Sequence, residues 1–402
     1  MTVEVRDRHP WRAAISIGVG TILAGMILQV WLIPTVNDLG YWWISDDAWT
    51  PLGPARAVAE GRLGHLYGAD PRWIAGPLAP ILLAPIWLAG RWFDLSSPLT
   101  GEVDRPTLWL AYGPLVLGWS IPLLYAVRAL AVEARRGVSA LGRLARVQWG
   151  TVALVLLPVA LLAGHLEDLI AITLVALAAR SALREDATWG AIWLALAIVT
   201  KQWALLAAPA LFAMVPAGSR IRWLAIAAGI PGVVFGGLFL ADPDSTGRAL
   251  FEGLAFPAAG KPALFVDPTD PLVGTPFRVA IVLVAAAFGV LVARRPGARA
   301  LLAAIGLSLL VRLALEPVLF AYYPAPALAF LALREYGETG HVRSTLVFGL
   351  AVTVLFPWEP GARVLWWIVQ GGLFLLLAAP AVRDLVGPRT ERRVPVPIER
   401  SS

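Results

Sequence analysis

Two adjacent carboxylates in a polar stretch of an otherwise apolar chain are the first candidates for chemistry. Asp46 and Asp47 lie within residues 37–76, a polar and aromatic segment that follows the first long apolar run. A like charge beside a carboxylate makes it a better proton acceptor, so one of the two could act as a general base. The pair could instead cap a short helix predicted over residues 51–61, because acids favour helix N-termini. The residues alone leave both interpretations open.

A second set of ionisable residues lies between two apolar runs, in residues 164–168, Gly-His-Leu-Glu-Asp. Ionisable side chains at membrane depth are costly unless they face partners or water. The turn could be a solvated hairpin between two spans. Alternatively, His165, Glu167 and Asp168 could line a site for a sugar phosphate.

A lysine marks a third position. Lys201 and Lys261 are the only lysines among 33 basic residues, and Lys201 separates two short apolar runs. A compact ammonium group at such a break could hold a phosphate, with a hydrogen bond from Gln202. The alternative is an interfacial anchor formed together with Trp203.

A fourth group lies near the end of a later apolar run. Arg312 and Glu316 are four residues apart, so they would share one helix face and could pair. Inside a membrane such a pair usually faces a cavity. The pair could be structural, or Arg312 could lie beside a donor phosphate while Tyr322 and Tyr323 contact a sugar or a prenyl chain.

The composition places these residues in a membrane protein. Of 402 residues, 58% are hydrophobic and 15% are charged, and the mean hydropathy is +0.71. A soluble domain has about 25% charged residues, so this chain is expected in a bilayer. The net charge of +6 comes from arginines clustered in short loops between apolar runs, which is the positive-inside pattern and argues against a nucleic-acid partner.

Cofactor chemistry is not expected from the sequence. The chain has no cysteine, which excludes disulfides and thiolate metal sites. Its four histidines are scattered without the spacing of a zinc motif. We therefore predict no cofactor, with a divalent cation left open as the alternative.

The apolar runs predict an all-α polytopic membrane protein with about twelve transmembrane helices. Residues 77–90 contain three prolines and are predicted to be re-entrant or interfacial, because a span there would place the basic loop 128–146 outside. The predicted spans are residues 13–34, 107–128, 147–163, 166–183, 187–200, 203–216, 221–240, 277–293, 300–316, 318–333, 344–356 and 362–382.

These spans predict one transmembrane domain over residues 1–382, with both termini cytoplasmic. The two long loops, 35–106 and 241–276, would then lie on the outer face, and long polar loops on one face suggest chemistry there. Residues 383–402 are basic and are predicted to be a cytoplasmic tail that attracts anionic membrane lipids.

One stretch of the first loop carries a family resemblance. Asp47, the following Ala-Trp-Thr-Pro, an Ala/Val-rich helix that ends at Glu60-Gly61, Leu66-Tyr67 and a Pro-interrupted apolar segment resemble the first outer loop of GT-C superfold glycosyltransferases. The pattern is most similar to actinobacterial polyprenyl-phosphate-mannose-dependent mannosyltransferases. The resemblance implies that Asp47 is the catalytic base. Ser45 stands where some members have the first Asp of a spaced pair, so no metal site is implied there.

Two of the other polar groups also have counterparts in this family. A similar Gly-His-x-Glu/Asp-Asp turn and a lysine in a Lys-x-x-Pro-like segment occur in its members, which favours the functional interpretation of both. We predict that the donor phosphate is bound by Lys201, Gln202 and Arg312. The predicted substrate contacts are Asp46, His165, Glu167, Asp168, Glu316, Tyr322 and Tyr323.

The function that the resemblance implies is an inverting hexosyltransferase. It would move a sugar, expected to be mannose, from a polyprenyl-phosphate donor to a lipid or glycan acceptor of the cell envelope, on the outer face. The chain has no GxGxxG or P-loop in a suitable context, which agrees with a lipid-linked donor. The alternative is a secondary transporter or lipid flippase with Glu316, Arg312 and Lys201 as an intramembrane relay, although the chain lacks a convincing internal repeat.

Overall fold

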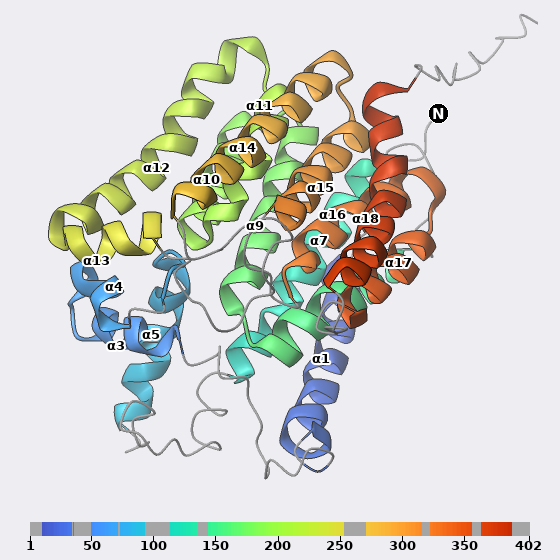
Figure 1. The fold of residues 1–402 in the computed structure, drawn as a ribbon. Coiled ribbons are helices and arrows are strands. Elements are labelled where there is room, and N and C mark those ends of the chain that lie inside the picture. The colour runs from blue at the N-terminus through green and yellow to red at the C-terminus, as the bar shows by residue number, and fades with distance from the viewer. Residues whose placement is uncertain are drawn as a thin grey trace, which may run out of the picture.

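The computed structural model describes residues 10–33, 35, 50–70, 73–92, 113–135, 144–252, 271–315, 322–355 and 363–387. These residues form sixteen α-helices with short 3₁₀ and π-helical stretches, and they contain no strand (Figure 1). The all-α prediction is therefore confirmed for the described part of the chain. The helices are α1 (Pro10–Ile27), α3 (Leu52–Ala59), α4 (Leu66–Ala69), α5 (Leu78–Trp92), α7 (Ser120–Ala134), α8 (Leu144–Thr151), α9 (Leu166–Leu183), α10 (Ala187–Thr200), α11 (Ala208–Ala213), α12 (Arg220–Ala241), α13 (Pro243–Gly247), α14 (Pro271–Arg294), α15 (Ala298–Leu315), α16 (Pro324–Thr339), α17 (Arg343–Leu355) and α18 (Arg363–Val386).

Seven helical segments among the described residues are long and apolar enough to cross a membrane. A multi-pass helical membrane protein is therefore confirmed, whereas the predicted count of twelve spans is not. The segments are Trp11–Leu32, Gly113–Ala134, Leu144–Ala163, Ala217–Ala241, Pro276–Arg294, Ala298–Leu315 and Ile368–Val386.

The remaining predicted spans fall on helices that are short or charged. Helix α10 has 14 residues and α17 has 13. At about 1.5 Å per residue each is roughly 20 Å long, less than the ~30 Å of a bilayer core. The predicted span 203–216 is a 3₁₀ segment, Gln202–Ala207, followed by the six-residue α11. Helix α9 has 18 residues but carries two acids in its first turn.

The proline-rich segment predicted to be re-entrant or interfacial forms one helix. Helix α5 contains Pro85 and packs against α3, with further contacts to α9 and α10. It is one of the shorter apolar helices, not one of the seven long segments. Its place relative to a membrane remains a prediction.

Burial divides the helices into inner and outer ones. Helix α9 is buried on almost every side, and α15 and α16 are largely buried as well. Helices α12, α14 and α18 expose large apolar side chains, such as Ile221 at 86% and Leu240 at 85%. An apolar outer surface of this kind suits contact with lipid tails.

One end of the bundle gathers most of the polar residues singled out above. The N-termini of α9 and α16 and the C-termini of α10 and α15 meet there, and we call it the α9 end. Helices α3, α4 and α13 also lie at this end (Figure 1). Helix α1 runs toward it, since Gln29 bonds to Leu161, and α18 runs away from it, since Asp384 pairs with Arg334. The two ends of the described chain therefore point away from the α9 end.

Candidate functional site

A glycine turn sets His165 and the two acids at the start of α9. The π-helical segment Val152–Ala163 ends at Gly164, whose φ of 71° is a conformation that side chains with a Cβ rarely adopt. The His165 N–H then donates to the Val159 carbonyl oxygen at 3.0 Å. Glu167 and Asp168 follow in the first turn of α9, where negative charge is favoured by the helix dipole.

A break in the helical chain sets Lys201 opposite this turn. Helix α10 ends at Thr200, and Lys201 is extended, with φ −150° and ψ 123°. Its N–H still bonds to the Ala197 carbonyl oxygen at 2.8 Å, and a 3₁₀ turn follows. The Lys201 side chain therefore projects from the point where α10 ends.

The two acids and the lysine form a buried ion-pair cluster. Lys201 Nζ lies 3.1 Å from Glu167 Oε1 and 3.5 Å from Asp168 Oδ2. His165 Nδ1 lies 2.7 Å from the same Glu167 oxygen. Trp203 Nε1 donates to Asp168 Oδ1 at 2.7 Å. Glu167 and Asp168 are each only 3% exposed, so their charges are balanced by neighbours and not by bulk water. We call these five side chains the α9-end cluster.

Aromatic rings extend the cluster toward α15 and α16. The His165 ring stacks on the Tyr322 ring with centroids 3.8 Å apart. Tyr322 meets Tyr323 edge to face at 5.1 Å. The Arg312 guanidinium carbon lies 4.7 Å from the centroid of the Tyr323 ring, a cation–π contact. Residues predicted as separate groups from sequence therefore meet at one end of the bundle.

Part of the first long loop hydrogen-bonds to the residues around Lys201, where α10 ends. The Gly76 N–H donates to the Thr200 carbonyl oxygen at 2.9 Å. The Gln202 side-chain amide donates to the Ile74 carbonyl oxygen at 2.8 Å, so in this structure it anchors the loop backbone. A Cβ built on Gly76 would lie 1.6 Å from the Val199 carbonyl oxygen, which explains why the loop needs glycine there.

The helix predicted over residues 51–61 is confirmed as α3. It ends at Ala59, and Gly61 follows with φ 74°. Pro51 is its N-cap residue, and no described side chain caps it with a hydrogen bond. Ala55 is fully buried, and α3 packs on α5.

Three predicted site residues, Asp46, Asp47 and Glu316, lie outside the described residues. The capping and catalytic interpretations of the two aspartates therefore both stand as predictions. The same holds for the proposed pairing of Glu316 with Arg312.

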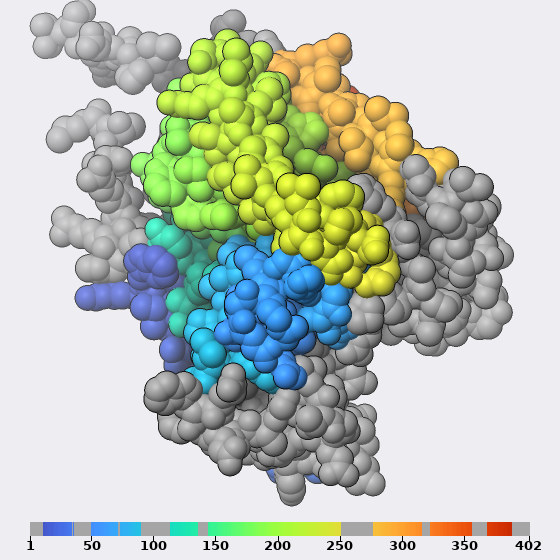
Figure 2. All heavy atoms as spheres, turned by 90° about the vertical axis from the view of Figure 1, so that its left-hand side faces the viewer, coloured from blue at the N-terminus to red at the C-terminus, as the bar shows by residue number. Residues whose placement is uncertain are grey.

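The second long loop touches the first beside the α9 end. Asp242 caps α13 by accepting a hydrogen bond from the Ser245 N–H at 3.1 Å, and this bond lowers the pKa of the Asp242 carboxyl group. Its Oδ2 lies 3.6 Å from His65 Nδ1. Figure 2 shows α13 in yellow directly against the blue segment that holds α3 and α4. Burial raises the pKa of the nearby Tyr67 phenol, so this group stays neutral.

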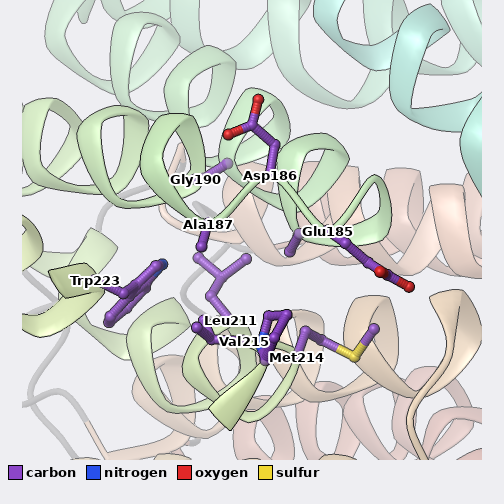
Figure 3. Close-up of a pocket in the computed structure, with 11 residues that line it drawn as sticks. Glu185, Asp186, Ala187, Gly190, Leu211, Met214, Val215 and Trp223 are labelled. Carbon is purple, nitrogen blue, oxygen red and sulfur yellow. The ribbon is translucent and has the colours of Figure 1, made fainter. Parts of the chain in front are cut away.

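A pocket at the opposite end of the bundle is a weaker candidate. It lies between the α9–α10 turn and the α11–α12 turn. Ala187, Gly190, Leu211, Val215 and Trp223 give it a mainly apolar lining. Figure 3 shows the carboxylates of the two acids in the α9–α10 turn pointing in different directions. This pocket therefore lacks the converging polar groups of the α9-end cluster.

Comparison with known proteins does not assign the chain to a family. No protein-family model matches the sequence. No curated protein matches it either. Interpretation of the site therefore rests on its own residues and geometry.

Sequence reasoning found most of the described cluster but missed the role of Trp203. It treated this residue only as a possible interfacial anchor, whereas its buried indole N–H bonds to Asp168. The signal was available, because a buried indole N–H needs an acceptor and Trp203 lies two residues after Lys201. Its partner could not be named without the fold.

The charges define what the cluster can do. Two carboxylates and one ammonium leave a net charge of −1 when His165 is neutral and zero when it is protonated. Lys201 is held between two acids, so it is not an isolated anion-binding cation. The arrangement can bind a cation or move protons directly. It can bind a phosphate only if positive charge is added or Lys201 moves.

Proposed function

We propose that the protein is a membrane hexosyltransferase that moves a sugar, expected to be mannose, from a polyprenyl-phosphate donor to a lipid or glycan acceptor. The observation that carries this proposal is the pair of hydrogen bonds between residues 74–76 and the residues on either side of Lys201, Thr200 and Gln202. These bonds tie the loop that contains Asp47 in sequence to the segment that carries Lys201. A polar cluster at the end of apolar helices suits a donor with a charged head and a prenyl tail.

Asp47 has the role of general base in the proposed reaction. It takes the proton of the acceptor hydroxyl as the hydroxyl oxygen bonds to the anomeric carbon. The bond between that carbon and the phosphate oxygen breaks, and its electron pair leaves with the lipid phosphate. Because a single displacement occurs from the opposite face, the anomeric configuration is inverted.

The α9 end supplies the other proposed roles. Arg312 and Lys201 stabilise the leaving phosphate, and Gln202 holds the loop backbone beside them. The packed rings of His165, Tyr322 and Tyr323 have the proposed role of contacting the sugar. Asp46 and Glu316 complete the proposed substrate contacts. Glu167 and Asp168 position Lys201.

The proposed orientation places the α9 end and both long loops on the outer face, with both termini in the cytoplasm. The clustering of arginine in the short loops supports this orientation. It is also supported by α1 and α18, whose chain ends point away from the α9 end. No nucleic-acid partner enters this proposal.

The first prediction tests the base directly. Replacing Asp47 by Asn (Asp47→Asn) removes the proton acceptor but keeps the size of the side chain. We expect sugar transfer from a panel of polyprenyl-phosphate sugars to fall by about 100-fold or more. The matched control is Asp186→Asn at the opposite end of the bundle, where asparagine still caps α10. Undiminished transfer by Asp47→Asn would show that the base is assigned wrongly.

The alternative function, a transporter, predicts different results for the same variants. It is favoured if the wild-type protein transfers no sugar from any donor but moves a labelled lipid phosphate across vesicle membranes. In that case Glu316→Gln should abolish movement while Asp47→Asn leaves it intact.

A further inference from the structure

Three side chains of the α9-end cluster hold possible ligand atoms close together. A ring nitrogen of His165 and one carboxylate oxygen each of Glu167 and Asp168 lie within 4.8 Å of one another, and all three residues are buried. We propose that these residues bind a divalent cation of the Mn²⁺ or Zn²⁺ type, which displaces the ammonium group of Lys201 from the two carboxylates.

The distances fit such an ion. A metal with bonds of about 2.1 Å places neighbouring ligand atoms roughly 3 Å apart and opposite ones roughly 4.2 Å apart. His165 Nδ1 lies 2.7 Å from Glu167 Oε1 and 3.8 Å from Asp168 Oδ2, which spans this range. One imidazole nitrogen and two carboxylate oxygens suit Mn²⁺ or Zn²⁺ better than Ca²⁺, which prefers oxygen alone.

The contacts of one buried oxygen are the second observation. Asp168 Oδ2 accepts no hydrogen bond from the described residues although the carboxylate is 96% buried, and its ion pair with Lys201 Nζ is long at 3.5 Å. A buried carboxylate oxygen with only so long a contact is incompletely satisfied. Trp203 holds the other oxygen at 2.7 Å and so aims Oδ2 toward His165 and Lys201. Orientation of a metal-binding carboxylate by an outer hydrogen bond is common in metal sites.

Lys201 occupies the place of the cation in the metal-free state. Its ammonium lies 3.1 Å from one carboxylate and 3.5 Å from the other, so it keeps the two acids close together. The lysine stem is flexible and its charge is a compact point, so it can withdraw when a divalent ion arrives. Metal binding then changes the net charge of the cluster, with neutral His165, from −1 to +1.

This charge change resolves the difficulty that Lys201 presents to phosphate binding. With the ion in place, the released ammonium, the metal and Arg312 all favour an anionic group. This consequence rests on the proposed function, whereas the cation site itself does not.

The experiment titrates Mn²⁺ into the purified full-length protein and follows the free ion by electron paramagnetic resonance. We expect one saturable site in the wild-type protein. Glu167→Gln and Asp168→Asn should weaken binding by about tenfold or more, because each removes a ligand charge. Lys201→Ala should bind Mn²⁺ more tightly than the wild-type protein, because the competing cation is gone.

The control is Asp186→Asn, a carboxylate removed at the opposite end of the bundle, which should bind Mn²⁺ as the wild-type protein does. No saturable binding by the wild-type protein overturns the proposal, as does binding that Glu167→Gln leaves unchanged. If the ligand variants do not fold, equal affinity of the wild-type protein and Lys201→Ala overturns it.

The experiments can contradict the cation site and the transferase proposal independently of each other. Intact Mn²⁺ binding by a wild-type protein that transfers no sugar from any donor overturns the function and leaves the site. Transfer that depends on Asp47 without any Mn²⁺ binding overturns the site and leaves the function.

Discussion

At the scale of single residues, the identity of each partner decides what a polar side chain does. Lys201 is conspicuous in the sequence as a lysine in an arginine-rich chain. An isolated lysine suggests a phosphate ligand, whereas the structure sets it between Glu167 and Asp168. The rarity of lysine in this chain indicates that position 201 matters. The chemistry of Lys201, however, depends on the two carboxylates that it contacts.

The Trp203–Asp168 hydrogen bond yields a prediction at this scale. Trp203→Phe keeps a buried ring but leaves Asp168 Oδ1 without its 2.7 Å donor. A buried carboxylate that loses a hydrogen bond costs about 1–3 kcal/mol, so we expect a lower thermal unfolding midpoint. The comparison is Trp149→Phe, since Trp149 is 56% exposed and its replacement should change the midpoint little. Equal midpoints for the two variants would contradict the role given to Trp203.

At the scale of elements, the site depends on two interruptions of helical structure. Gly164 reverses the chain before α9, and Lys201 ends α10 in an extended conformation. Both interruptions lie at the α9 end, and residues 74–76 of the first loop hydrogen-bond to the residues beside the second one. The apolar runs that the sequence analysis interpreted as separate spans are therefore bounded by these two interruptions, which bring the start of α9 and the end of α10 side by side.

Gly76 yields the prediction for this contact. Because a Cβ there would lie 1.6 Å from the Val199 carbonyl oxygen, Gly76→Ala must move the loop backbone away from α10. We expect a loss of roughly 3 kcal/mol or more in the free energy of unfolding, measured in detergent by denaturant titration. Transfer activity should fall with it, because the loop that contains Asp47 loses its anchor.

The matched substitution is Gly236→Ala in α12. A Cβ at Gly236 meets nothing within 4 Å, and alanine favours the helix by about 0.5–1 kcal/mol. Gly236→Ala should therefore be neutral or slightly stabilising. A Gly76→Ala protein as stable as Gly236→Ala would rule out the tight packing of the loop against α10.

At the scale of the whole molecule, the outer surface and the charge distribution argue for a particular orientation. Helices α12, α14 and α18 expose apolar side chains, and the short loops carry the arginines. The positive-inside rule then predicts that the arginines between α7 and α8 lie in the cytoplasm and that the α9 end lies outside.

Reporter fusions test this orientation. A fusion after residue 140 should report the cytoplasm, and a fusion after residue 95 should report the outer compartment, because α5 is predicted not to cross the membrane. Alkaline phosphatase and green fluorescent protein fusions give opposite readouts at each position and so check one another. A cytoplasmic signal after residue 95 would show that residues 77–90 span the membrane.

The sequence by itself determined the class of the protein and most of its candidate residues. A composition of 58% hydrophobic residues requires a bilayer, and ionisable residues between apolar runs are too costly there to be incidental. The number of spans was not determined, because an apolar run of 13 or 14 residues looks the same whether it crosses a membrane or ends inside a bundle.

Only the tertiary structure decided which of these residues meet. His165 stacks on Tyr322, Lys201 pairs with both acids of α9, and Gln202 bonds to the first loop. These contacts join residues far apart in sequence, and they depend on how α9, α10 and α16 pack against one another. Periodicity and composition describe the faces of single helices and carry no information on that packing, so the partner of each polar group could be named only from the fold.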